Sequence, residues 1–261
     1  MHLHSPMPRS GTPAREADPR STRRRYRRGE TLLHAGDAGD VLRIERGLVK
    51  LVVPAFDGRD RVLAVVGAGD LLGAEAALGH EAHVADAVAL GAVTVVACDR
   101  TAFLTDLRSD PERAVAVAQS VVQRLRAAWD DQARTYRPVH ERLAAAMVDL
   151  AHRFGEPGHD GRRVLSCGLD HQALASLIGA QRASVSVAMG EFRRAHAAAG
   201  ARGTYTIDVA RLRELAGAAA SVVGAREGGA SATAQRPTNR TTASSTGSRS
   251  MVSSTSVVVN G

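Results

Sequence analysis

The segment from His171 to Gly190 constrains the fold of this chain more than any other. Two short helices that cross in a helix-turn-helix need a small residue at the crossing, a glycine in the tight turn and apolar residues that lock the pair together. Ala175, Gly179 and Val185 fall at these positions. The segment therefore predicts a helix-turn-helix whose second helix, from Gln181 to about His196, lies in the major groove of duplex DNA.

Polar side chains around this motif are candidates for DNA contact. Arg182 can donate two hydrogen bonds to O6 and N7 of guanine, and Gln181 can pair with adenine. Ser184 and Ser186 can bond a phosphate or a base edge. Downstream, residues 200–207 (GARGTYTI) predict the turn and strand of a wing, in which Arg202 is placed to meet a phosphate.

Residues 29–110 show short β-type runs separated by turn residues. Asp57 and Gly58, between two apolar runs, are typical of a tight hairpin. Strands at this spacing predict a small antiparallel sandwich or barrel. The predicted strands are Thr31–His34, Val41–Ile44, Leu48–Val53, Arg61–Val66, Val84–Ala89 and Val93–Cys98.

A long helix is predicted to follow, over Pro111–Arg137. Asp110 supplies a capping residue, Pro111 suits the first helical position, and Pro138 ends the helix. One stripe repeats at heptad spacing and predicts a dimer seam, although it could instead pack on the chain's own β domain. The stripe consists of Ala118, Val122, Leu125, Trp129, Gln132 and Tyr136. A further amphipathic helix is predicted over Val139–Phe154, with a short strand at Val164–Ser166.

Both ends of the chain, residues 1–28 and 216–261, lack apolar periodicity and are predicted to be disordered. The basic run from Arg23 to Arg28 could touch phosphates, but a solvated tail is the favoured interpretation. The net charge is +7, and acids outnumber bases only in the front domain. This distribution fits a sensor domain joined to a nucleic-acid binder, or simply a solvated surface with basic tails.

Several classes of function are disfavoured by composition. Aromatic residues make up only 3% of the chain, which argues against base-stacking platforms for single strands or RNA. Cys98 and Cys167 form no metal-spaced cluster, and His80 and His83 suggest surface loop residues more than metal or haem ligands. No apolar run could span a bilayer, and no nucleophile–base pair or phosphate loop stands out. We expect a cytoplasmic, non-enzymatic protein without metal or cofactor.

The order of β domain, long helix and winged helix-turn-helix resembles the family of the cyclic-AMP receptor protein and FNR. The resemblance rests on residues 29–37, 47–51, 69–73 and 173–187, and it covers residues 29–215. It implies an α+β fold: a cyclic-nucleotide-binding-like β-roll or jelly roll (29–110), a dimerisation helix (111–137) and a winged helix-turn-helix domain (138–215). It also implies a homodimer that binds a palindromic promoter site and contacts RNA polymerase.

The effector site departs from the family pattern. Gly73 is retained, but the family's glutamate falls on Ala74, its Arg-Ser pair on Val84 and Ala85, and its Thr-Ser pair on Ala127 and Ala128. A buried phosphate without these partners would be an uncompensated charge. We therefore expect a degenerate pocket without cyclic nucleotide, as in the family's effector-independent stress-response branch. The four-cysteine iron–sulfur site of the FNR branch is also missing from the sequence.

The base-reading positions depart as well. The family's Arg-Glu-Thr run falls on Arg182, Ala183 and Ser184, and its second arginine falls on Val187. The chain is expected to read a half-site other than the commonest one, through fewer direct contacts. The alternative hypothesis is a module that senses a small molecule other than cyclic AMP and has a weakened or altered DNA readout.

Overall fold

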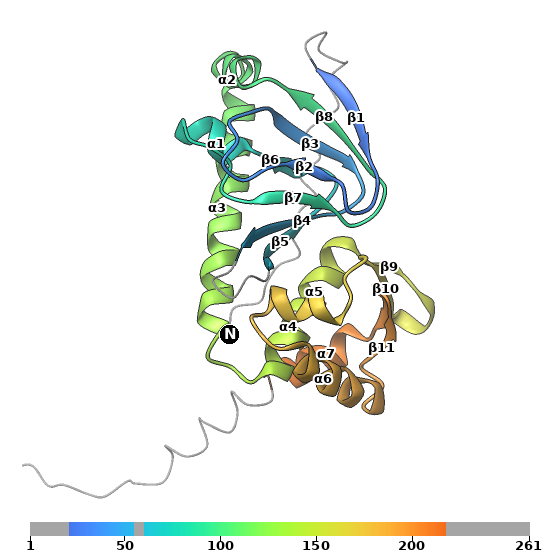
Figure 1. The fold of residues 1–261 in the computed structure, drawn as a ribbon. Coiled ribbons are helices and arrows are strands. Elements are labelled where there is room, and N and C mark those ends of the chain that lie inside the picture. Colours follow the sequence, from blue (N-terminus) through green and yellow to red (C-terminus); the bar gives the residue numbers. More distant parts are fainter. Residues whose placement is uncertain (1–20, 55–59, 218–261) are drawn as a thin grey trace, which may run out of the picture.

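The computed structural model describes residues 21–54 and 60–217. They form a β-rich unit and a smaller helical unit, and the long helix α3 (Pro111–Arg134) runs along one side of the molecule (Figure 1). The architecture is α+β, as the sequence predicts. Residues 1–20 and 218–261 of the tails predicted at 1–28 and 216–261, and the Asp57-Gly58 turn, lie outside the described residues.

Two four-stranded antiparallel sheets build the β-rich unit, with strand orders β1-β8-β3-β6 and β2-β7-β4-β5. Their inward side chains alternate along the strands, and β8 buries every second residue. Leu42, Ile44, Val49 and Val95 fill the core between the sheets. The bounds are β1 Thr22–Tyr26, β2 Thr31–Leu33, β3 Val41–Arg46, β4 Val49–Pro54, β5 Asp60–Val66, β6 Leu71–Leu72, β7 Asp86–Ala89 and β8 Val93–Cys98.

Strand β1 corrects the prediction of a disordered tail through residue 28. It pairs in regular antiparallel register with β8, although most of its side chains are exposed arginines. Arg23 forms a 2.8 Å ion pair with Glu45, and Arg24 a 2.7 Å pair with Asp40. Charged side chains suit a strand at the edge of a sheet, because the backbone supplies the pairing and the charges discourage further strand addition.

Three helices lie together on one side of the β-roll: α1 (Ala74–Gly79), α2 (Arg100–Ser109) and α3 (Figure 1). Asp110 caps α3, because its carboxylate accepts from the N–H of Arg113 at 3.1 Å. The helix ends at Arg134, three residues before the predicted Arg137, so Tyr136 lies in the following turn. Neither α1 nor α2 was expected from the sequence.

The helical unit carries a further four-stranded sheet, of order β11-β12-β10-β9. Its core joins Leu143 and Met147 of α4 to Phe192 of α6 and Ile207 of β12. The bounds are α4 Val139–Phe154, β9 Glu156–Pro157, η1 His159–Gly161, β10 Arg163–Ser166, α5 His171–Leu177, α6 Arg182–Arg194, β11 Ala198–Ala201, β12 Thr204–Ile207 and α7 Val209–Gly217. Helix α7 was not expected, and it includes the first two residues of the predicted C-terminal tail.

The two units share one apolar cluster. Val52, Val62, Val65 and Leu90 of the β-roll pack with buried residues of the helix-turn-helix unit. Helix α5 lies next to β5 (Figure 1). Among the described residues, no helix is both long and apolar enough to cross a bilayer.

Candidate nucleic-acid interface

Helices α5 and α6 cross as the sequence predicts. Ala175 and Val185 are completely buried at the crossing. Gly179 has φ of 63°, a left-handed conformation that costs a glycine little, and the N–H of Ala180 donates to the carbonyl of Ala175 at 2.8 Å. The turn therefore holds α6 in a fixed orientation against α5.

Helix α6 has one buried and one exposed face. Val185, Ala188, Met189 and Phe192 point into the core. Arg182, the first helical residue, is exposed, as are Ala183, Ser186 and Val187. The predicted contact residue Gln181 is exposed at the N-cap, whereas Ser184 is half-buried and two residues from Arg182, so these two side chains do not share a face.

The wing is the hairpin of β11 and β12, which turns at Arg202 and Gly203. Arg202 has φ of 52° and an exposed side chain. It lines a groove with Arg182, Asp170, His171, Gln172 and Ala201. The structure thus brings two of the predicted DNA-contacting arginines, one from the helix and one from the wing, to a single groove.

Tyr205 anchors the wing beneath this groove. Its hydroxyl donates to the carbonyl of Leu169 at 2.8 Å, and the side chain is completely buried. Burial raises the pKa of Tyr205 to about 12, so the phenol stays protonated and keeps its donor. Strand β12 is thereby fixed to the loop that precedes α5.

His171 is a residue of this surface that the sequence analysis missed. Its Nδ1 lies 3.0 Å from the hydroxyl oxygen of Ser186, and its Nε2 is buried without a hydrogen-bond partner in residues 21–54 and 60–217. Ser186, a predicted DNA contact, is therefore already held by α5. Only the proximity of α5 and α6 reveals this pair, since the residues lie 15 positions apart.

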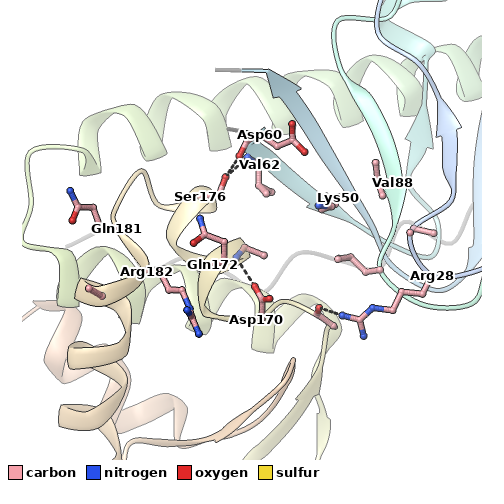
Figure 2. Close-up of a pocket in the computed structure, with 16 residues that line it drawn as sticks. Arg28, Lys50, Asp60, Val62, Val88, Asp170, Gln172, Ser176, Gln181 and Arg182 are labelled. Carbon is pink, nitrogen blue, oxygen red and sulfur yellow. Dashed lines mark hydrogen bonds between the residues drawn. The ribbon is translucent and has the colours of Figure 1, made fainter. Parts of the chain in front are cut away.

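A cleft between the two units reaches the start of α6. Arg28, Lys50 and Asp60 lie on its β-roll side, with Gln172 and Arg182 opposite (Figure 2). Arg28 donates to the carbonyl of Gly168 at 3.2 Å. A second bond between the units comes from Arg153 of α4, which donates to the carbonyl of Val65 at 3.1 Å. The helix-turn-helix is therefore docked on the β-roll by side chains from both units.

The residues predicted to form the degenerate effector pocket do not all face the interior of the β-roll. Gly73 and Ala74 begin α1, and Ala74 and Ala85 are buried, but Val84 is 64% exposed. His83 points inward instead, because burial alternates along residues 83–89 and Val84 falls on the outer side. Val84 was therefore wrongly placed in the degenerate pocket, and His83 is not the surface histidine that the sequence suggested.

His83 is packed tightly against the start of α1. It is 4% exposed, and neither ring nitrogen has a hydrogen-bond partner within the described part of the chain. Gly73 has φ of 75°, and a Cβ there would lie 2.7 Å from Cε1 of His83. The imidazole thus fills the space in front of Gly73, while Ala127 and Ala128 are exposed on α3.

All six residues of the predicted dimer seam are exposed in the single chain. Val122 is 48%, Leu125 46% and Trp129 58% exposed. The stripe therefore does not pack on the chain's own β domain, the alternative that the sequence left open. Instead Val117 faces inward from α3, and Arg124 donates to the carbonyl of Leu71 at 2.5 Å.

Comparisons with known proteins agree with this architecture. The cyclic nucleotide-binding domain family matches residues 23–110, and the Crp-like helix-turn-helix domain family matches residues 141–215. The CRP-like cAMP-activated global transcriptional regulator of Mycobacterium tuberculosis is 30% identical over 169 residues, which cover 64% of this chain and 75% of that protein. The chain belongs to the Crp/Fnr family. This is a family of DNA-binding transcription regulators, not of enzymes.

Solved structures of Crp/Fnr regulators share the fold. A CRP-family transcriptional regulator from Thermus thermophilus has a TM-score of 0.62 and 27% identity, over 74% of this chain and 96% of that one. FixK2 from Bradyrhizobium japonicum has a TM-score of 0.65 and 22% identity, over 75% and 96% of the two chains. The β-roll, the long helix and the winged helix-turn-helix are thus those of a Crp/Fnr regulator.

Proposed function

We propose that this Crp/Fnr regulator is a cytoplasmic homodimer that binds a palindromic promoter site without cyclic nucleotide. The observation that carries the proposal is the shared groove of Arg182 and Arg202. Arg182 begins α6, where a side chain reaches base edges, and Arg202 lies on the wing, where a side chain reaches phosphate. Gln181 and Ser186 add polar groups on the same surface, whereas Ser184 supports it less well because it faces away from Arg182.

The α3 stripe supports the homodimer. Val122, Leu125 and Trp129 form an exposed apolar line on a helix of 24 residues. A second copy of this helix would bury these apolar side chains, and Gln132 would place a polar side chain within the dimer seam. Two helix-turn-helix units related by a two-fold axis then match a palindrome.

Independence from cyclic nucleotide is supported by the chemistry in front of Gly73. The Mycobacterium tuberculosis relative is described as cAMP-activated, but here Ala74, Ala85, Ala127 and Ala128 offer no polar side chain to a nucleotide. His83 fills the adjoining space. A cyclic phosphate would lose its hydration without gaining a cationic partner of the arginine type.

Selection of duplex sites from a random pool by the full-length protein, without added ligand, tests the DNA-binding proposal. We expect an inverted repeat, and a pool that stays random would contradict it. Transcription in vitro from a promoter that carries the selected site tests contact with RNA polymerase. Selected sites upstream of genes whose transcription changes under stress would place the protein in the stress-response branch.

Calorimetry at millimolar cyclic AMP or cyclic GMP should show no saturable heat. A dissociation constant below about 100 µM, roughly −5.5 kcal/mol, would contradict independence from nucleotide.

The second candidate function, sensing of a small molecule other than cyclic AMP, is favoured by His83 alone. A buried imidazole with neither nitrogen paired among the described residues is costly, and a ligand with a hydrogen-bonding group could pair it. A selected site whose affinity changes on addition of a metabolite mixture, in the wild type but not in His83→Leu, would support this candidate.

A further inference from the structure

Val187 is an exposed apolar side chain on the surface that we assign to DNA. It is 63% exposed, although the other large apolar residues of α6 are buried. On a helix that we assign to DNA, this side chain is stabilised where an apolar group of the DNA removes it from water.

The helical geometry relates Val187 to Arg182. At about 100° per residue, Arg182, Ala183, Ser186 and Val187 lie within an arc of about 140° on the exposed side of α6. The five residue steps from Arg182 to Val187 span about 7.5 Å along the helix axis. Base pairs rise by roughly 3.4 Å, so the two side chains reach positions about two base pairs apart.

The charges around Val187 favour DNA over an apolar protein surface. Arg182, Arg193 and Arg194 are exposed on α6 against one exposed acid of that helix, Glu191, and Arg202 is exposed on the wing. This net positive charge complements phosphates, and the small side chain of Ala183 lets the helix approach the groove floor closely. Among the base edges in the major groove, the only apolar group is the 5-methyl of thymine.

We infer that Val187 reads a thymine through its 5-methyl group, about two base pairs from the guanine bound by Arg182. This inference rests on the proposed function. It gives the recognition helix an apolar readout at the position where the common family pattern has a second arginine. The regulator then prefers a T·A pair at one fixed position in each half-site.

The test replaces single thymines of the selected site by deoxyuridine, which removes the methyl and keeps the base-pairing edge. Affinity of the full-length protein is measured by fluorescence anisotropy. For the wild type we expect one position per half-site where the replacement weakens binding about fourfold, the factor for one methyl group removed from water. Val187→Ala should bind the thymine and deoxyuridine duplexes equally, and Leu63→Ala, an exposed apolar residue of β5, should behave as the wild type.

Two results would overturn the inference while leaving the proposed function intact. One is a wild type that binds a selected site specifically yet ignores every deoxyuridine replacement. The other is a Val187→Ala variant that keeps the same methyl sensitivity. If Val187→Ala instead impairs transcription without changing DNA affinity, Val187 contacts a protein and the inference is wrong. Failure to select any site would contradict the proposed function itself.

Discussion

Ser176 and Val62, which belong to different structural units, are joined by a 2.9 Å hydrogen bond from the backbone N–H of Val62 to the side-chain oxygen of Ser176. The Ser176 hydroxyl donates in turn to the carbonyl of Asp60 at 2.7 Å. Strand β5 is the outer strand of its sheet, so α5 supplies the partner that a further strand would otherwise provide (Figure 2).

Ser176→Ala should therefore loosen β5. Amide exchange at Val62 should become roughly fivefold faster, the factor for a net contribution of about 1 kcal/mol. Hydrogen exchange followed by NMR or mass spectrometry measures this, with Ser166→Ala, an exposed serine of β10, as the control. Unchanged exchange at Val62 would mean that the two units separate in solution.

Leu125→Glu should convert the dimer to monomer. Two glutamates facing each other in an apolar seam lose hydration and repel. Because Leu125 is 46% exposed in the single chain, the far-UV circular dichroism of each chain should be unchanged. Sedimentation at micromolar concentration is the measurement. The control Arg126→Glu introduces the same residue one position along α3 and should stay dimeric. A dimeric Leu125→Glu variant would place the interface elsewhere.

Arg182→Ala and Arg202→Ala should weaken DNA binding in different ways. Loss of a bidentate arginine–guanine contact costs roughly 1–3 kcal/mol, so Arg182→Ala should lose about ten- to a hundredfold affinity for the selected site and relax its preference at one base. Arg202→Ala should weaken specific and random DNA alike and lower the salt slope by about one per subunit. Titrations of both duplexes at several salt concentrations separate the two. Equal behaviour of the variants would make Arg182 a phosphate contact.

His152 should make the folded chain less stable in acid. His152 is exposed as a residue, but partial desolvation of its ring and the nearby charges of Arg213 and Arg163 lower its pKa. Arg213 donates to Nε2 of His152 at 3.1 Å, which requires an unprotonated nitrogen. The unfolded chain therefore takes up this proton at a higher pH than the folded chain, and stability falls as the pH drops below about 6.5.

Urea unfolding at pH 7.5 and pH 5.5 measures this effect. His152→Gln keeps an acceptor for Arg213 but does not titrate, so its stability should depend less on pH than that of the wild type. His159→Gln, an exposed histidine of η1, should keep the wild-type dependence. An equal pH dependence in His152→Gln would show that His152 is not coupled to folding.

The sequence determined the elements whose signals are local. Asp110 and Pro111 define the start of α3 by capping, Gly179 defines the turn by its left-handed φ, and the alternation of Val93–Cys98 defines β8 to the residue. These features depend on a few neighbouring residues, so spacing and residue type are enough to find them. The same is true of α4, whose predicted bounds agree with the structure.

Only the tertiary structure decided which distant groups meet. Strand β1 exists because β8 offers it hydrogen bonds, and the arginines of β1 gave no local β signal. His83 lies in front of Gly73 instead of Val84 because burial alternates along the segment that leads into β7, so a shift of one residue turns a side chain to the opposite side. The pairs Ser176–Val62 and His171–Ser186 join segments that come together only when the chain folds, and no pattern within either segment encodes the partner.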